Sequence, residues 1–144
     1  MASVKLRWVP PWEILWRAIP KPLTDGRLLL ALDEGINSKT GRQVFACQDT
    51  FDHAAKTNQS PLPWARTIVT VGLLKLTHGR WSCLPLAFDF YLRLKTLRAG
   101  CLRVRGPALV FQTKFAQAVR LIERLAGVFV AVPILVVTDS VGNK

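Results

Sequence analysis

Cysteine is scarce in this sequence of 144 residues, and its spacing argues against two common ways of stabilising a small protein. The three cysteines, Cys47, Cys83 and Cys101, are odd in number and include no Cys-x-x-Cys pair. A disulfide framework and a cysteine-based zinc site are therefore not expected, and a reducing environment is the simpler assumption. We accordingly expect a cytoplasmic protein.

Long apolar runs are also lacking. The N-terminal residues carry charge and prolines where a signal peptide needs an apolar stretch. The longest apolar run, from Leu125 to Val137, is interrupted by Pro133 and is shorter than the roughly 18 to 20 residues that span a bilayer. Neither secretion nor a membrane span is expected, and this run predicts the end of a helix followed by a buried strand.

Acidic side chains are few: nine Asp and Glu stand against twenty Lys and Arg, which gives a formal net charge of +11. A chain of this length that is half hydrophobic predicts one folded domain, and the excess of positive charge suits contact with a polyanion such as DNA. The basic residues are dispersed and form no run of five or six, so we expect a charged face on a globular body rather than a disordered basic tail.

What the sequence does contain is two aspartates, each placed where an apolar run stops. Asp33 ends the run that starts at Arg27, and Asp139 ends the run that starts at Pro133. Such runs predict strands buried on both faces of a sheet, and a carboxylate at a strand end lies where ligands bind. Two such strands side by side would bring the carboxylates together. Carboxylate oxygens suit magnesium, and paired metal ions serve enzymes that cut phosphodiesters.

The remaining patterns place a short amphipathic helix before the first strand, with Trp12, Leu15, Trp16 and Ile19 at helical spacing. We expect its tryptophans to pack onto the sheet rather than to stack on bases. A lead-in over residues 1–26 is followed by one domain over residues 27–144. Within it we expect a strand at 27–33, a long loop at 34–63, a hairpin of strands 66–76 and 81–92 around the turn at His78 and Gly79, a basic connection at 93–107, a helix at 114–126 that stops at Gly127, and a strand that ends at Asp139. A crossover helix would deliver the last strand parallel to the first.

This order, with carboxylates on the first and fourth strands, resembles the ribonuclease H-like fold of DDE nucleases. The strings Leu30-Ala-Leu-Asp33-Glu34-Gly, Val44 to Lys56, Trp81 to Arg93 and Val136-Val-Thr-Asp139-Ser140 resemble the DDE domain of bacterial insertion-sequence transposases. The resemblance runs from about residue 5 to residue 140. It implies an α/β fold with a ribonuclease H-like mixed sheet, flanking helices and an incomplete C-terminus.

The resemblance also implies chemistry. Asp33 and Asp139 take the positions of two catalytic, metal-holding aspartates that, with a later glutamate, bind two Mg²⁺ ions. No acidic residue follows Asp139, and the family's usual Ser-Trp-Phe-Gly-Asn is here Ser140-Val141-Gly142-Asn143. The implied protein is a truncated transposase fragment without strand-cutting activity, with DNA and an intact transposase as partners. Strand four, near Val130, Ile134 and Val136, would be incompletely covered and would favour association.

Other interpretations stay open. Each aspartate can simply end a strand at a turn. Glu34 is a false third acid, because adjacent side chains of a strand point to opposite faces. Asp49, Asp52 and His53 lie in the long loop and more plausibly belong to a segment that orders on DNA than to a metal site. At the level of function, the alternatives are a non-catalytic basic DNA-binding or interaction module and, from composition only, a basic protein at membrane surfaces.

Overall fold

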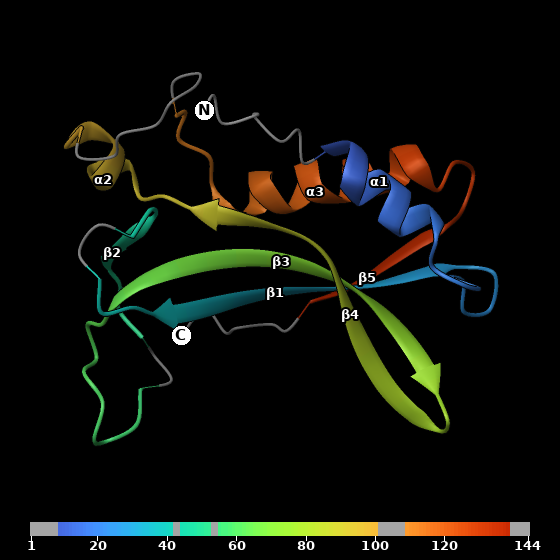
Figure 1. Cartoon of the computed structure of the whole chain (residues 1–144), viewed down its shortest axis with the longest axis horizontal. Coiled ribbons are helices and arrows are strands. Elements are labelled where there is room, and N and C mark those ends of the chain that lie inside the picture. The colour runs from blue at the N-terminus through green and yellow to red at the C-terminus, as the bar shows by residue number, and fades with distance from the viewer. Residues whose placement is uncertain (1–8, 42–43, 53–54, 101–108, 139–144) are drawn as a thin grey trace, which may run out of the picture.

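The computed structural model describes residues 9–41, 44–52, 55–100 and 109–138, and these form a mixed α/β fold with one five-stranded sheet (Figure 1). The elements in chain order are α1 (Val9–Arg17), β1 (Leu28–Ser38), β2 (Cys47–Asp49), β3 (Trp64–Thr77), β4 (Arg80–Tyr91), α2 (Leu94–Arg98), α3 (Lys114–Val128) and β5 (Ile134–Thr138).

The sheet combines an antiparallel meander with one parallel strand. β1 pairs with β3 and β3 with β4, both antiparallel, while β5 lies parallel to β1 on its other side. The short β2 pairs with the first residues of β3 beyond the end of β4. The predicted order of strand, hairpin, helix and parallel strand is confirmed, because a parallel return of this kind needs a crossover and α3 provides it.

Four sequence expectations about element bounds are wrong. β1 continues to Ser38 instead of ending at Asp33, because β3 supplies backbone partners as far as Ala65. The expected loop at 34–63 therefore contains the end of β1 and all of β2. The connection at 93–107 contains the helix α2, and α3 runs past Gly127 to Val128. Pairing and packing have overridden local preferences at each of these points.

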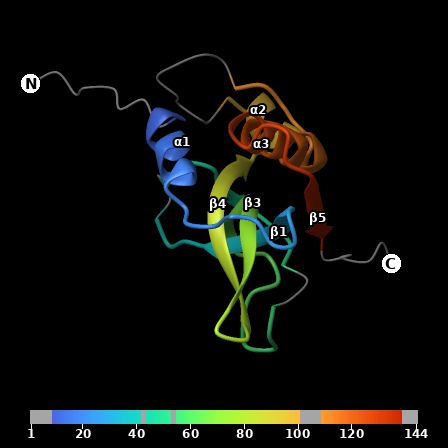
Figure 2. The same ribbon diagram turned by 90° about the vertical axis from the view of Figure 1, so that its right-hand side faces the viewer.

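The core lies between the sheet and the helices α1 and α3, which sit on the same side of the sheet in Figure 1 and in the perpendicular view of Figure 2. Alternate residues of β1 and β3 face this side, and they pack against α3 residues that are three or four positions apart. The fully buried apolar side chains include Leu28, Leu30, Val71, Leu73, Leu121 and Leu125. Each contributes about 1.5 to 3 kcal/mol relative to an exposed position.

No described helix covers the opposite face of the sheet. Leu135 and Val137 of β5 alternate with the half-buried Ile134 and Val136, and they stay 45% and 48% exposed. Val130, just after α3, is 75% exposed. The prediction of incomplete cover is therefore confirmed for Val130 and wrong for Ile134 and Val136, which pack against the core because they face the helices. The exposed side chains of β5 are Leu135 and Val137. Within the described ranges, no helix is long and apolar enough to cross a membrane.

The turn between β3 and β4 is confirmed as a tight hairpin. His78 and Gly79 have φ values of 50° and 74°. Positive φ at both central residues is the geometry of a type I′ turn, whose twist matches that of the flanking strands. Glycine takes this conformation at little cost. The turn fixes the register in which β3 pairs with β4 along their whole length.

Trp16 anchors α1 to the sheet. Its side chain is 1% exposed, and its indole Nε1 donates a hydrogen bond of 2.8 Å to the carbonyl of Leu86. Leu86 lies in a β-bulge, since Ala87 pairs with Val71 and Pro85 with Gly72. The bulge leaves that carbonyl available, and the indole satisfies it. The expected packing of the tryptophans is confirmed, because Trp16 is buried in the core and Trp12 packs against it, whereas Leu15 of the same helix is 54% exposed.

We predict that Trp16→Phe lowers the free energy of unfolding by about 2 to 3 kcal/mol, because it leaves the Leu86 carbonyl unsatisfied and opens a small cavity. Urea unfolding followed by circular dichroism measures this loss. Ile14→Ala, at a side chain that is 69% exposed on the same helix, is the control and should change stability by less than about 0.5 kcal/mol. Equal losses in both variants would contradict the anchoring role of Trp16.

Candidate functional site

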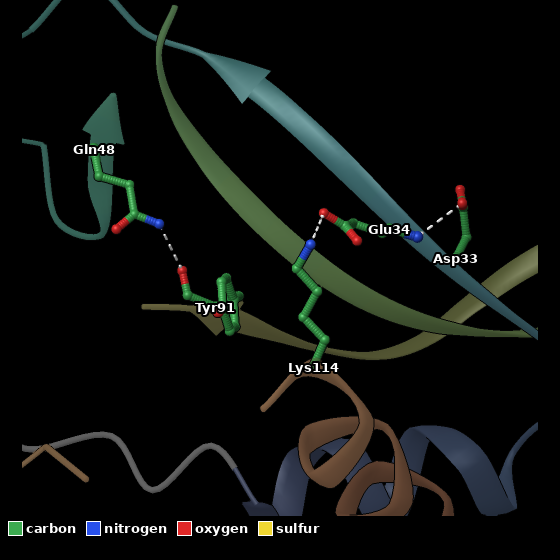
Figure 3. A network of polar contacts seen from close by, with 5 residues as sticks. All are labelled: Asp33, Glu34, Gln48, Tyr91 and Lys114. Atoms are coloured by element: carbon green, nitrogen blue, oxygen red, sulfur yellow. Dashed lines mark hydrogen bonds and ion pairs between the residues drawn. The ribbon is translucent and has the colours of Figure 1, made fainter. Parts of the chain in front are cut away.

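Asp33 lies in the middle of β1, paired with Thr70 of β3. The prediction that it marks the end of its strand is therefore wrong. Its neighbour Leu32 faces the helices, so the alternation of the strand turns Asp33 toward the uncovered face, where it is exposed. Its Oδ1 accepts a hydrogen bond of 2.8 Å from the backbone amide of Glu34 (Figure 3). One carboxylate oxygen is thus held by the backbone of its own strand.

The second predicted site residue, Asp139, lies outside the described residues. The residue before it, Thr138, is the register partner of Leu32, the residue before Asp33. The two strands are neighbours and parallel, as the sequence predicts. The approach of the two carboxylates stays a prediction.

Glu34 belongs to the other side of the sheet. Its register partner, Val69, is 3% exposed beneath α3. The Glu34 carboxylate binds the ammonium group of Lys114 at the start of α3, with an Nζ–Oε1 distance of 2.5 Å (Figure 3). The expectation that Glu34 cannot serve as the third acid is consistent with this geometry, because an ion pair on the helix side engages its carboxylate.

A second ion pair joins α3 to the sheet at the same register position. Asp89 of β4 is also a register partner of Val69, and its carboxylate pairs with Arg120 of α3. Glu34 and Asp89 thus flank Val69, and each receives one basic residue from the helix. The sequence does not reveal this role of Asp89, because the alternation Phe88-Asp89-Phe90 favours the two apolar side chains, and not the acid, on the helix-facing side. Lys114 and Arg120 are thus neutralised locally by acids of the sheet.

Basic side chains gather at the end of the sheet where β1 ends. Arg66 of β3 is the register partner of Asn37 near the end of β1, and its guanidinium lies 5.1 Å from the ring centroid of Phe90. Arg93, Lys95 and Arg98 follow β4 in and beside α2 and are exposed. Figure 1 places α2 close to β2 at this end, away from the tip of the β3–β4 hairpin.

Gln48 fixes α2 in that position. Its side chain is 5% exposed, and its Nε2 donates to the carbonyl of Tyr91 at 3.3 Å (Figure 3). Its Oε1 accepts from the backbone amide of Arg93 at 3.2 Å and from the hydroxyl of Thr96 at 2.6 Å. The hydrogen bonds of this buried amide join β2, the end of β4 and α2. They therefore hold α2, which carries Lys95 and Arg98, in a fixed position.

The described residues do not assemble a metal site on their own. They contain no group of three or more His, Cys, Asp and Glu side chains able to hold an ion. Asp49 lies on β2, and His53 falls outside the described residues. Asp33 is therefore one of the two expected Mg²⁺ ligands, and its expected partner, Asp139, lies outside the described residues.

No family model, curated protein or solved structure matches this chain.

We predict that Asp33→Thr raises the free energy of unfolding by about 0.5 to 1 kcal/mol. Aspartate is unfavourable within a strand, whereas threonine suits a half-exposed strand position opposite Thr70. A gain in stability on replacement is typical of residues kept for function. Thermal unfolding measures the change, with Asn37→Thr on the same face of β1 as the matched control. A loss of stability specific to Asp33→Thr would show that this carboxylate has a structural role.

Proposed function

We propose that this chain is a ribonuclease H-like module of the DDE insertion-sequence transposase type, and that it binds DNA without cutting it. The observation that carries the proposal is the position of Asp33. It is an unfavourable acidic residue in the centre of a sheet, exposed on the face away from the helices, on the strand that lies parallel to the one leading to Asp139.

The strand order supports the ribonuclease H-like assignment. An antiparallel meander β1, β3, β4 is followed by the crossover helix α3 and by β5, parallel to β1 on its free side. This arrangement agrees with the order that the resemblance implies, including an aspartate on the first strand. Magnesium, if bound as in that family, would use Asp33 and Asp139.

The charge distribution supports DNA as the partner. Of the basic residues, Lys114 and Arg120 are ion-paired within the fold. Arg93, Lys95 and Arg98 remain exposed beside α2, at the end toward which β1 runs. Phosphate groups neutralised there would release counterions, which favours binding without reading base sequence.

Binding is favoured over cleavage because the acids near Asp33 are engaged elsewhere. Glu34 faces the helices and pairs with Lys114, and Asp89 pairs with Arg120. Two Mg²⁺ ions need more carboxylate oxygens than the two expected ligands, Asp33 and Asp139, supply. The second candidate, a non-catalytic interaction module, is favoured by the apolar side chains on the uncovered face of β5. In this case too the chain would not cut DNA.

We predict that Lys95→Gln/Arg98→Gln weakens binding to duplex DNA more than Arg27→Gln/Arg80→Gln does. Both pairs remove two exposed charges, but Arg27 and Arg80 lie at the start of β1 and at the hairpin tip. Fluorescence anisotropy across a salt series measures the affinities. Loss of two phosphate contacts should reduce the slope of log K against log salt by about 2.

Equal weakening by the two double variants would mean that total charge alone drives binding. Salt-independent binding, or no binding at low salt, would remove DNA as the proposed partner. Unrelated duplexes of equal length should bind with similar affinity, since phosphate contacts carry no sequence information.

We also predict no Mg²⁺-dependent nicking of supercoiled plasmid above that of an Asp33→Ala control. Agarose electrophoresis after incubation with the full chain measures nicked product. Nicking that is abolished by both Asp33→Ala and Asp139→Ala would overturn the non-cutting assignment and would show that two carboxylates suffice. Retained DNA binding in these variants would separate loss of chemistry from loss of contact.

A further inference from the structure

The outer edge of β5 carries backbone groups that no described strand engages. β5 stands at the end of the sheet order, with β1 as its only neighbour among the described strands. The amide of Leu28 donates to the carbonyl of Pro133 at 2.9 Å, so the groups of Pro133 point toward β1. Since these groups alternate along a strand, those of Leu135 and Val137 also point inward. The amides and carbonyls of Ile134, Val136 and Thr138 point outward.

This edge lacks the features by which proteins usually prevent strand pairing. No charged residue occurs from Leu125 to Thr138, and the only proline of that stretch, Pro133, precedes the strand. Lysines, inward-pointing charges and prolines within an edge strand are the usual protection. An apolar strand with free outward amides is instead a template for another strand.

We propose that the β5 edge pairs antiparallel with β5 of a second copy, which joins the two sheets into one. Charge selects this occupant and this place. Each copy carries a formal charge of +11, so two copies repel over most of their surface. The stretch that ends in β5 contains no charge at all, so it is the surface at which repulsion is lowest. An acidic partner would instead be drawn to the basic side chains beside α2.

The strand is also complementary to itself. In an antiparallel pair centred on Val136, the outward groups of Ile134, Val136 and Thr138 meet the same groups of the second copy. Leu135 lies opposite Val137 of the second copy on the uncovered face, where these side chains are 45% and 48% exposed in one copy. Pairing would therefore bury apolar surface and satisfy backbone groups together. The inference is independent of the proposed DNA binding.

Sedimentation equilibrium of the full chain over a range of concentrations tests the proposal. Val136→Pro removes an outward amide while leaving intact the bonds of Leu135 and Val137 to β1. Leu135→Lys/Val137→Lys places charges on both sides of the proposed two-fold axis. The matched control, Leu76→Lys/Leu84→Lys, adds the same charge at side chains that are 52% and 48% exposed on the β3–β4 hairpin.

We expect the unmodified chain to form a reversible dimer and the control to dimerise within about threefold of it. Val136→Pro and Leu135→Lys/Val137→Lys should each weaken dimerisation at least tenfold, with circular dichroism confirming that they fold. If Val136→Pro fails to fold, the lysine pair decides the question. A chain that stays monomeric at all concentrations, or a dimer that withstands the lysine pair, overturns the proposal.

Salt separates this inference from DNA binding. Added salt screens the repulsion between copies, so dimerisation should strengthen as salt rises. DNA binding should weaken over the same range, because it releases counterions. Dimerisation that weakens with salt would show that charged contacts, and not the β5 edge, hold the copies together.

Discussion

The structure depends on the double pairing of β1. Its backbone bonds on one side to the antiparallel β3 and on the other to the parallel β5, while Leu28 and Leu30 are fully buried beneath α3. A parallel neighbour can be reached only by a crossover, so the presence of β5 beside β1 requires a connecting segment that packs on the sheet. The helix α3 is this segment: it connects β4 to β5, and it also buries the apolar side of β1.

The same strand separates two adjacent acids. Glu34 faces the helix layer and neutralises Lys114, whereas Asp33 faces away and accepts a hydrogen bond from the amide of Glu34. The alternation of a strand therefore gives neighbouring carboxylates different uses. Glu34, with Asp89 on the far side of Val69, holds α3 over the sheet. Asp33 makes no comparable contact with the helix layer, which leaves its carboxylate available at the exposed face.

Positive charge and apolar surface are also separated in this molecule. The exposed basic side chains near α2 lie at the end toward which β1 runs, and Gln48 positions that helix. The uncharged stretch includes β5, which stands at the other end of the strand order from β2, the strand beside α2. A polyanion and a second copy of the chain would therefore use different surfaces. They would also respond to salt in opposite directions, because one contact releases counterions and the other reduces repulsion between like charges.

The sequence by itself determined the order of the four longer strands, the hairpin turn at His78 and Gly79, the amphipathic helix over Lys114 to Ala126 and the parallel relation of the first and last strands. Periodicity and turn chemistry are local, so they can be read without a partner. Only tertiary pairing decided that β1 extends past Asp33 to Ser38, because Gly35, Asn37 and Ser38 are poor strand formers that β3 holds in register. Tertiary contacts likewise assigned Asp89 and Gln48 their roles, since their partners lie 31 and 43 to 48 residues away in the chain. The sequence therefore identified Asp33 as a candidate site residue, whereas the fold decided which face of the sheet presents it.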